Sequence, residues 1–188
     1  YNRLLVAPRT IRSGLLEKIN REIENKKAGK HAFVRLKLNS LLDEEFVEAL
    51  YRASIAGVEI DLVVRGICSL LPGIPGVSEN IRVRSVLGRF LEHSRIFHFA
   101  NDGNDEIYIG SADLMDRNLN RRVESLVQIT RPEHKKDLIK VFDLYVSSTT
   151  SGWHLLPTGK WLKVDKAPDG SPLNDLQAVM IDSYRVNL

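Results

Sequence analysis

Several short stretches of the chain are apolar, or alternate between apolar and polar residues with a period of two, which is typical of β-strands. These stretches are 4–7, 32–38, 58–65, 81–86, 93–99, 106–110 and 123–129. Elsewhere apolar residues recur every three or four positions, which predicts helices with one buried face. Helices are expected between Thr10 or Ser13 and Gly29, between Asp43 and Gly57, from Pro132 through Tyr145, and within 173–184.

The first part of this order, strand–helix–strand–helix–strand, predicts parallel strands joined by right-handed crossovers. The stretch 58–65 is the strongest strand, and its second half is apolar on both sides, as expected inside an α/β sheet. Arg65 lies at the carboxyl end of that strand, where ligands gather in open α/β sheets. Arg65 is therefore a candidate ligand contact, and a surface salt bridge is the alternative.

Residues 89–122 hold the densest group of side chains capable of chemistry. The strand 93–99 places His93 and Arg95 on one face, and a run of turn formers joins it to the strand 106–110. This hairpin brings His93 beside the end of the second strand, where more polar side chains follow: Ser111, Asp113, Arg117, Asn118, Arg121 and Arg122. Such a group suits phosphate, because guanidinium forks bind its oxygens and an imidazole can transfer a proton or attack phosphorus.

Structural roles compete with these chemical ones. Asp113 can pair with a nearby arginine, orient His93, or cap the turn that follows it, and the sequence leaves all three open. At least one arginine of the 117–122 loop is expected to form a structural ion pair, for which Glu124 is a candidate partner. The remaining histidines lack such company and are interpreted as structural: His31, His98, His134 and His154.

Composition narrows the class of protein. The 188 residues, 43% hydrophobic and 27% charged, can form a proper core. We divide them into a domain at 1–146 and a tail at 147–188, where Ser, Thr, Gly and Pro accumulate. A net charge of +3 is too small to argue for nucleic acid. No stretch reaches the roughly 18 apolar residues of a membrane span.

Some kinds of site are excluded by spacing. The single cysteine, Cys68, allows no internal disulfide, fits a reducing compartment, and is expected to be a buried thiol. The chain has neither the clustered His and Cys spacing of metal ligands nor a Walker A loop, so we assign it no metal site of its own.

Four segments resemble a known family: LLVAPRTIRSGLLEKINREIENKKAGK at 4–30, LKLNSLLDEEFVEALYRASIAGVEIDLVVRGICSL at 36–70, PGIPGVSENIRVRSVLGRFLEHSRIFHF at 72–99 and YIGSADLMDRNLNRRVE at 108–124. The chain is similar there to the carboxyl-terminal part of the long bacterial polyphosphate kinase, and the similarity extends to about residue 145. Leu114 departs from the family, which usually has Trp at that position.

This resemblance implies a phospholipase D-like α/β fold, a mixed sheet flanked by helices. Each half-site of that fold carries a His-x-Lys signature, and His93-Ser94-Arg95 stands in its place with Arg for Lys. The implied reaction is reversible transfer of the terminal phosphate of ATP to inorganic polyphosphate, through a phosphohistidine in the preceding domain, upstream of Tyr1. Arg65 and His93 match positions that contact the ATP phosphates, with His93 as the catalytic residue and the other polar residues of 95–122 in support.

The resemblance also implies partners. ATP and ADP are substrates, and Mg²⁺ is expected to have its ligands upstream of this chain. The preceding domains of the same polypeptide, inorganic polyphosphate and further copies in a homo-oligomer are expected partners. A cytoplasmic location is expected, either free or associated with a membrane as part of a complex, and the chain alone is expected to be inactive.

Two other functions stay open. The first is a phosphodiesterase of the phospholipase D class that works as a dimer with His93 from each subunit, although Arg95 in place of Lys speaks against it. The second is a non-catalytic phosphate-binding module. Release of choline or a nucleotide from a diester substrate would decide for the phosphodiesterase. Full activity of a complete enzyme that carries His93→Ala and Arg65→Ala would favour the binding module.

Overall fold

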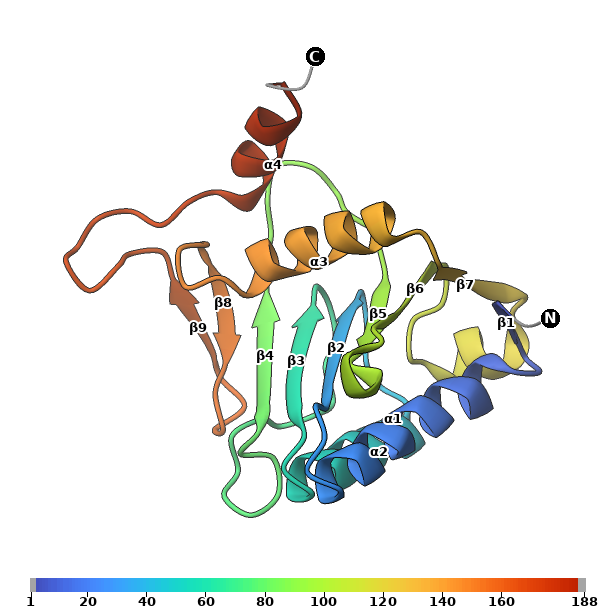
Figure 1. Ribbon diagram of the computed structural model, residues 1–188. Coiled ribbons are helices and arrows are strands. Elements are labelled where there is room, and N and C mark those ends of the chain that lie inside the picture. The colour runs from blue at the N-terminus through green and yellow to red at the C-terminus, as the bar shows by residue number, and fades with distance from the viewer. Residues whose placement is uncertain (1–2, 186–188) are drawn as a thin grey trace.

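A computed structural model describes residues 3–185 as a mixed sheet with helices on both faces (Figure 1). The strands are β1 Leu4–Ala7, β2 Phe33–Leu38, β3 Glu59–Val64, β4 Ile81–Ser85, β5 Ile96–Phe99, β6 Glu106–Gly110, β7 Glu124–Ile129, β8 Gly152–Leu155 and β9 Trp161–Val164. The α-helices are α1 Ile11–Lys27, α2 Glu44–Ile55, α3 Pro132–Val146 and α4 Leu176–Arg185, and short helical turns are η1 Asn101–Gly103 and η2 Arg117–Arg121. The strand order is β1-β7-β6-β5-β2-β3-β4-β8-β9.

The register of the central strands brings several strand ends to one edge of the sheet. β2, β3 and β4 are parallel, whereas β5 is antiparallel to β2 and β6 is antiparallel to β5. Lys37 near the end of β2 pairs with Ile96 at the start of β5, and Ile96 pairs with Ile109 near the end of β6. We call this the carboxyl edge: the ends of β2, β3, β4 and β6 together with the start of β5.

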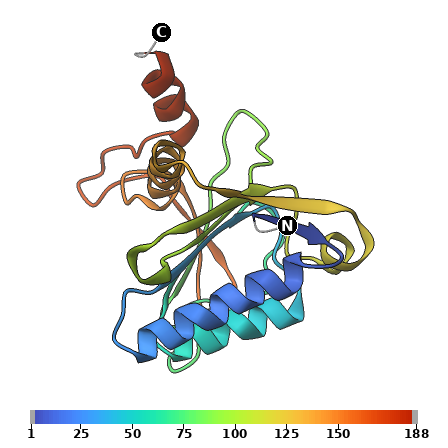
Figure 2. The same ribbon diagram turned by 45° about the vertical axis from the view of Figure 1, so that its right-hand side comes forward.

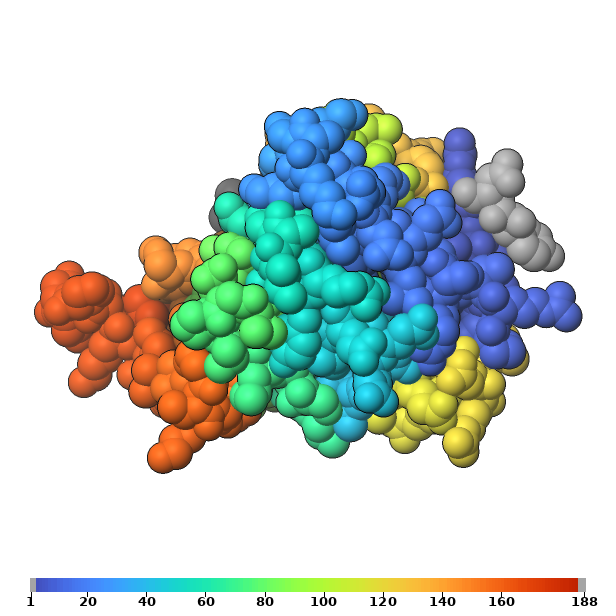
Figure 3. Space-filling model, turned by 90° about the horizontal axis from the view of Figure 1, so that it is seen from below, coloured from blue at the N-terminus to red at the C-terminus, as the bar shows by residue number. Residues whose placement is uncertain are grey.

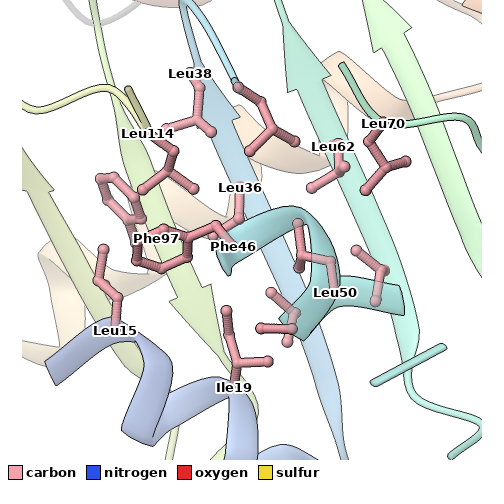
Figure 4. Close-up of a cluster of buried hydrophobic side chains, with 14 of the residues drawn as sticks. Leu15, Ile19, Leu36, Leu38, Phe46, Leu50, Leu62, Leu70, Phe97 and Leu114 are labelled. Atoms are coloured by element: carbon pink, nitrogen blue, oxygen red, sulfur yellow. The ribbon is translucent and has the colours of Figure 1, made fainter. Parts of the chain in front are cut away.

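Helices cover the two faces unequally. α1 and α2 lie side by side against one face (Figures 2 and 3). α3 crosses the other face (Figure 1). The main core lies under α1 and α2, where Phe46 of α2 and Phe97 of β5 are fully buried between the sheet and the helices (Figure 4). A smaller cluster lies under α3 and includes Phe142 and Tyr145. Both faces of the central strands are therefore largely covered, as expected when helices pack on both sides of a sheet.

The expected strands at 4–7, 32–38, 58–65, 81–86, 106–110 and 123–129 are confirmed to within one residue at either end. The expected parallel strands are confirmed as neighbours for β2, β3 and β4, and β1 runs parallel to them but lies at the edge of the sheet. β1 pairs antiparallel with β7, and β7, β6 and β5 separate it from β2. The hairpin β5–β6 and the strand β7 lie between β1 and β2, because β6 forms full antiparallel ladders with both β5 and β7.

The expected helix ends are largely confirmed. Asp43 caps α2, since its carboxylate accepts a bond from the Phe46 backbone N–H at 3.4 Å. Gly29 follows α1 with a φ of +72°, the left-handed conformation of a helix end. Thr10 occupies the N-cap position of α1, but its hydroxyl accepts from the Val6 backbone N–H at 2.8 Å rather than capping the helix.

The strand expected at 93–99 is shorter than the alternation indicates. β5 begins at Ile96, so His93 and Arg95 lie in a loop, which we call the His93 loop (residues 86–95). The physical reason is that β5 has no pairing partner beyond this point within residues 3–185. β2 ends at Leu38, and the backbone N–H of the next residue, Asn39, donates to the Asp113 carboxylate instead. The hairpin itself is confirmed, with η1 in the expected turn and the His93 end of β5 beside the Ser111 end of β6.

Residues after 146 continue the sheet, which the sequence did not indicate. β8 pairs antiparallel with β4, and β9 pairs with β8. Arg84 of β4 fixes the connection, because its guanidinium donates to the carbonyls of Ser147 at 2.8 Å and Thr150 at 2.9 Å. The expected last helix is α4, and its buried Leu176 joins the cluster under α3. The division at 146/147 stays a prediction.

A close approach of β6 and β7 makes Gly110 a sensitive position. A Cβ atom on Gly110 would lie 1.9 Å from the Ser125 carbonyl oxygen, which is backbone and cannot move aside without disturbing the ladder. We expect Gly110→Ala to lower the free energy of unfolding by about 3 kcal/mol, the upper part of the range for overpacking. Gly76→Ala, whose Cβ meets nothing within 4 Å but whose φ is +74°, should cost only about 1 kcal/mol.

Chemical denaturation of the two variants, compared with the unmodified chain, measures both effects. Equal losses for Gly110→Ala and Gly76→Ala would contradict the close contact between β6 and β7.

Candidate functional site

The loops that leave the carboxyl edge are tied to one another by backbone pairing. Leu41, after β2, forms bridges with Cys68, after β3, and with Leu114, after β6. The backbone N–H of Leu42 donates to the Leu114 carbonyl at 2.8 Å. Three loops from distant parts of the sequence are therefore fixed at the point where the sheet ends, which is the usual place for a ligand site in an open α/β sheet.

Asp113 is the centre of the polar contacts at this edge. Its carboxylate accepts from the Asn39 backbone N–H at 2.7 Å, from the Ser40 backbone N–H at 3.4 Å, and from Arg95 through Nε at 3.3 Å and Nη2 at 2.9 Å. Burial acts to raise the pKa of Asp113, but the bonds from Arg95 and Asn39 outweigh it and hold that pKa below its ordinary value. Asp113 is therefore an ionised anchor, and Arg95 is its fixed partner.

Asn39 carries the network on to Arg65. The Asn39 amide oxygen accepts from Arg65 Nε at 2.9 Å, so Arg65, Asn39, Asp113 and Arg95 form one connected chain of side chains. Arg65 is half-buried, and among residues 3–185 no hydrogen bond reaches its Nη1 or Nη2. Two guanidinium groups are thus fixed at one edge, and Arg65 has donors to spare for an anion.

His93 lies beside this network with a free imidazole. Its backbone carbonyl accepts from Arg95 Nη1 at 2.6 Å, and its side chain is exposed without a hydrogen-bond partner within residues 3–185. Arg65 and the neighbouring Glu92 both line a surface hollow of about 210 Å³ under the His93 loop. His93 and Arg65 therefore belong to the same edge of the molecule, although the imidazole itself projects outward.

The other predicted residues are mostly occupied with structure. The Ser111 hydroxyl accepts from the Ser125 backbone N–H at 3.3 Å, which ties β6 to β7. The buried Asn118 amide donates to Glu124 at 2.7 Å. Of the three open roles for Asp113, pairing with an arginine is confirmed, and its partner is Arg95.

Two of the three arginines of the 117–122 loop form structural ion pairs. Arg122 lies 3.8 Å from Glu124, so the expected structural ion pair is present, and Arg121 pairs with Asp116 at 2.9 Å. Arg117 is exposed and has no ion-pair partner in the part of the chain that the structure describes. Arg117 is therefore the member of this group that stays free to meet an anion.

His98 and Cys68 have the structural surroundings that the sequence predicts, although Cys68 is less buried than expected. His98 lies on the face opposite to the main core, 3.4 Å from Asp105 and edge-on to Phe33, and burial lowers its pKa. Cys68 is half-buried rather than fully buried, and burial raises the pKa of its thiol, which disfavours the reactive thiolate.

Sequence reasoning missed Asn39, Lys37 and Glu92. The strand 32–38 shows only alternation, which does not reveal that α3 covers the face that carries Lys37, a residue only 4% exposed. The predicted amphipathic helix after Pro132 was the available signal, since a helix with an apolar face needs a sheet face to cover.

Residues 3–185 are informative about metal binding and membrane spans. In that range no group of three or more His, Cys, Asp or Glu side chains is placed to hold a metal ion. None of the helices in the same range has the length and apolar character needed to cross a lipid bilayer.

Comparison with known proteins gives consistent matches. Residues 4–175 match the family described as "Polyphosphate kinase C-terminal domain 2". The chain is 54% identical to a polyphosphate kinase of Streptomyces coelicolor over 98% of its own length and 25% of the relative's. It is 49% identical to a polyphosphate kinase of Prochlorococcus marinus over 90% of its length and 24% of that protein's. The chain thus spans about a quarter of the length of these curated relatives.

Solved structures agree with this match. The crystal structure of polyphosphate kinase from Porphyromonas gingivalis superposes with a TM-score of 0.90 and 38% identity, covering 98% of this chain and 28% of that one. Nuc from Salmonella typhimurium, a phospholipase D family member, superposes with a TM-score of 0.58 at 15% identity, covering 82% of this chain and 97% of its own. The expected phospholipase D-like mixed sheet flanked by helices is confirmed.

Proposed function

Because the chain belongs to the family described as polyphosphate kinase C-terminal domain 2, we propose that it builds one side of a polyphosphate kinase active site. The reaction is reversible transfer of the terminal phosphate of ATP to inorganic polyphosphate. The observation that carries the proposal is the connected network Arg65–Asn39–Asp113–Arg95 at the carboxyl edge. Beside it lies the imidazole of His93, which has no hydrogen-bond partner within residues 3–185.

Phosphoryl transfer is catalysed mainly by positioning the reactants and by neutralising charge on the moving group. The free Nη groups of Arg65 are proposed to bind phosphate oxygens, because Asn39 already fixes the plane of the guanidinium through Nε. His93 is proposed to act as a proton donor or a second phosphate contact at the same group. Arg95 has a supporting role, since Asp113 and the His93 carbonyl take up its donors.

The phosphorylated histidine is proposed to lie in the preceding domains of the same polypeptide, which would face this edge. Exposed apolar side chains at the edge support such a covering partner: Ile67 is 60% exposed, Phe90 57% and Leu91 72%. The length of the relatives supports it as well, because the chain spans only a quarter of them.

The residues of the edge do not offer a magnesium site. Mg²⁺ prefers carboxylate and water oxygens, whereas the cations Arg65 and Arg95 dominate here. The two nearby carboxylates are occupied, since Asp113 pairs with Arg95 and Glu92 accepts from the Tyr145 hydroxyl. We therefore route no step of the reaction through a metal held by this chain, and propose that the Mg²⁺ ligands belong to the preceding domains.

Further partners are proposals of the same kind. Polyphosphate is a polyanion, and the exposed Arg117 could line its path toward the edge. A homo-oligomer and a cytoplasmic location, free or associated with a membrane within a complex, complete the proposal.

The test compares the isolated chain with the complete enzyme that contains it. We expect the isolated chain to make polyphosphate from ATP at least about 10³-fold more slowly, because the groups that face this edge are missing. Equal activity of the two proteins would contradict the proposal. Release of a nucleotide from a phosphodiester substrate by the isolated chain would instead support the phosphodiesterase alternative.

A further inference from the structure

Lys37 is a buried ammonium directly beneath the His93 loop. It is the second-last residue of β2, its side chain lies on the face that α3 covers, and it is only 4% exposed. Its Nζ donates to the Ser94 hydroxyl at 2.8 Å and to the Ser94 carbonyl at 3.2 Å. It also lies 4.0 Å from Glu92 Oε2 and 4.8 Å from the centre of the Tyr145 ring. One buried cation therefore contacts the residues on both sides of His93.

The same segment is held from α3 and α4. The Tyr145 hydroxyl of α3 donates to the carboxylate of Glu92, which fixes that side chain against the sheet. The amide of Gln177 in α4 makes two bonds with the Phe90 backbone, accepting from its N–H and donating to its carbonyl, each at 2.8 Å. Figure 1 shows the loop between β4 and β5 rising toward α4.

His93 is the exception within this well-anchored segment. Its neighbours Glu92 and Ser94 are fixed through Lys37, and Arg95 holds its carbonyl at 2.6 Å. The imidazole has no partner among the residues that the structure describes. This arrangement fixes the backbone direction of one side chain and leaves its ring free for a ligand.

A gain in folding stability does not explain the buried ammonium of Lys37. An ammonium taken out of water loses hydration that contacts with other groups only partly restore, and apolar replacements of buried ion pairs are often neutral or stabilising. Burial together with the nearby Arg65 and Arg95 lowers the pKa of Lys37, although Glu92 and Asp113 act in the opposite direction. An apolar residue would fill the same space between β2 and α3 without this cost.

We propose that Lys37 is a positioning residue for His93, acting through Ser94 and Glu92 on the His93 loop. The inference rests on the proposed function of His93 at the phosphoryl group. Tyr145 also contributes to this positioning, because its hydroxyl holds Glu92 within reach of Lys37. No covalent step is assigned to Lys37, whose side chain is buried beneath the His93 loop and only 4% exposed.

The first experiment uses Lys37→Met in the complete enzyme, with ATP and polyphosphate as substrates. We expect kcat to fall about 10-fold to 100-fold, because a small misplacement of a catalytic group is costly, while the KM for ATP changes less than 3-fold. In a protein that already carries His93→Ala, adding Lys37→Met should change kcat by less than 2-fold, because the residue it positions is absent.

Lys18→Met is the matched control. Lys18 lies on α1, 3.0 Å from Glu106 and 5.2 Å from the centre of the Tyr108 ring, so it has the same kind of neighbours far from the His93 loop. We expect kcat of Lys18→Met to be unchanged. A fall in kcat as large as that of Lys37→Met, or an undiminished effect of Lys37→Met beside His93→Ala, would overturn the positioning role.

Tyr145→Phe keeps the inference testable if Lys37→Met does not fold, since it removes only a hydroxyl. It should lower kcat by about 3-fold to 10-fold and lose that effect beside His93→Ala. Full activity of both Lys37→Met and Tyr145→Phe in an enzyme that His93→Ala inactivates would overturn this inference alone. Full activity of His93→Ala would instead overturn the proposed function.

Discussion

Replacing His93 by alanine in the complete enzyme is expected to lower kcat for polyphosphate synthesis by about 10²-fold to 10⁴-fold, the range for a positioned acid or base. The reason is geometric. The backbone of His93 is fixed from both sides, so alanine at this position leaves the loop in place but without its imidazole. Fold and stability should be unaffected, because the side chain is exposed and has no partner within residues 3–185.

Steady-state synthesis of polyphosphate from ATP measures the effect, and thermal unfolding verifies the fold. His134→Ala is the matched control, since His134 is an exposed histidine in the first turn of α3, at the opposite end of that helix from Tyr145. Its activity should equal that of the unmodified enzyme. A complete enzyme that keeps full activity with His93→Ala would show that this imidazole is dispensable and that the site lies elsewhere.

The sequence predicts the elements of this fold better than their neighbours. Strands and helices follow from local periodicity, and six of the seven expected strands are confirmed nearly to the residue. Which strands pair is a property of the whole chain, and β1 shows this: its local pattern predicts a strand but not that its hydrogen-bond partner is β7. β8 and β9 are short strands at one edge, and their turn-rich sequence carries little periodic signal.

The residues of the candidate site also differ in how well local sequence reveals them. Arg65, His93 and Asp113 are recognisable because their residue types stand next to strand ends. Asn39 is not recognisable, since an Asn-Ser pair after a strand indicates only a turn. Lys37 is not recognisable either, because alternation in β2 cannot reveal that α3 covers the second face. Residues that connect or position others are defined by tertiary neighbours, which local patterns do not contain.

Replacing Asp113 by asparagine is expected to lower the free energy of unfolding at pH 7 by about 3 kcal/mol, the cost of breaking a buried ion pair. The variant leaves Arg95 without its partner at 17% side-chain exposure, and it weakens the charge-assisted bond from the Asn39 backbone N–H. Asp116→Asn is the matched control: Asp116 pairs with Arg121 at the same 2.9 Å, but both are exposed, so the loss should stay within about 0.5 kcal/mol.

The deficit of Asp113→Asn is also expected to depend on pH in one direction. The pKa of Asp113 in the folded chain lies below its ordinary value of 3.8, so the folded state favours the carboxylate. The stabilisation is therefore complete above that ordinary value and is lost as the pH falls through the lower, folded value. In denaturant unfolding measured downward from pH 7, the difference between the variant and the unmodified chain should begin to shrink near pH 3.8 and keep shrinking as the pH falls further. A deficit that stays constant with pH would mean that the charge of Asp113 does not hold Arg95 and Asn39 in place. That outcome would contradict the role of Asp113 in the proposed phosphate-binding network.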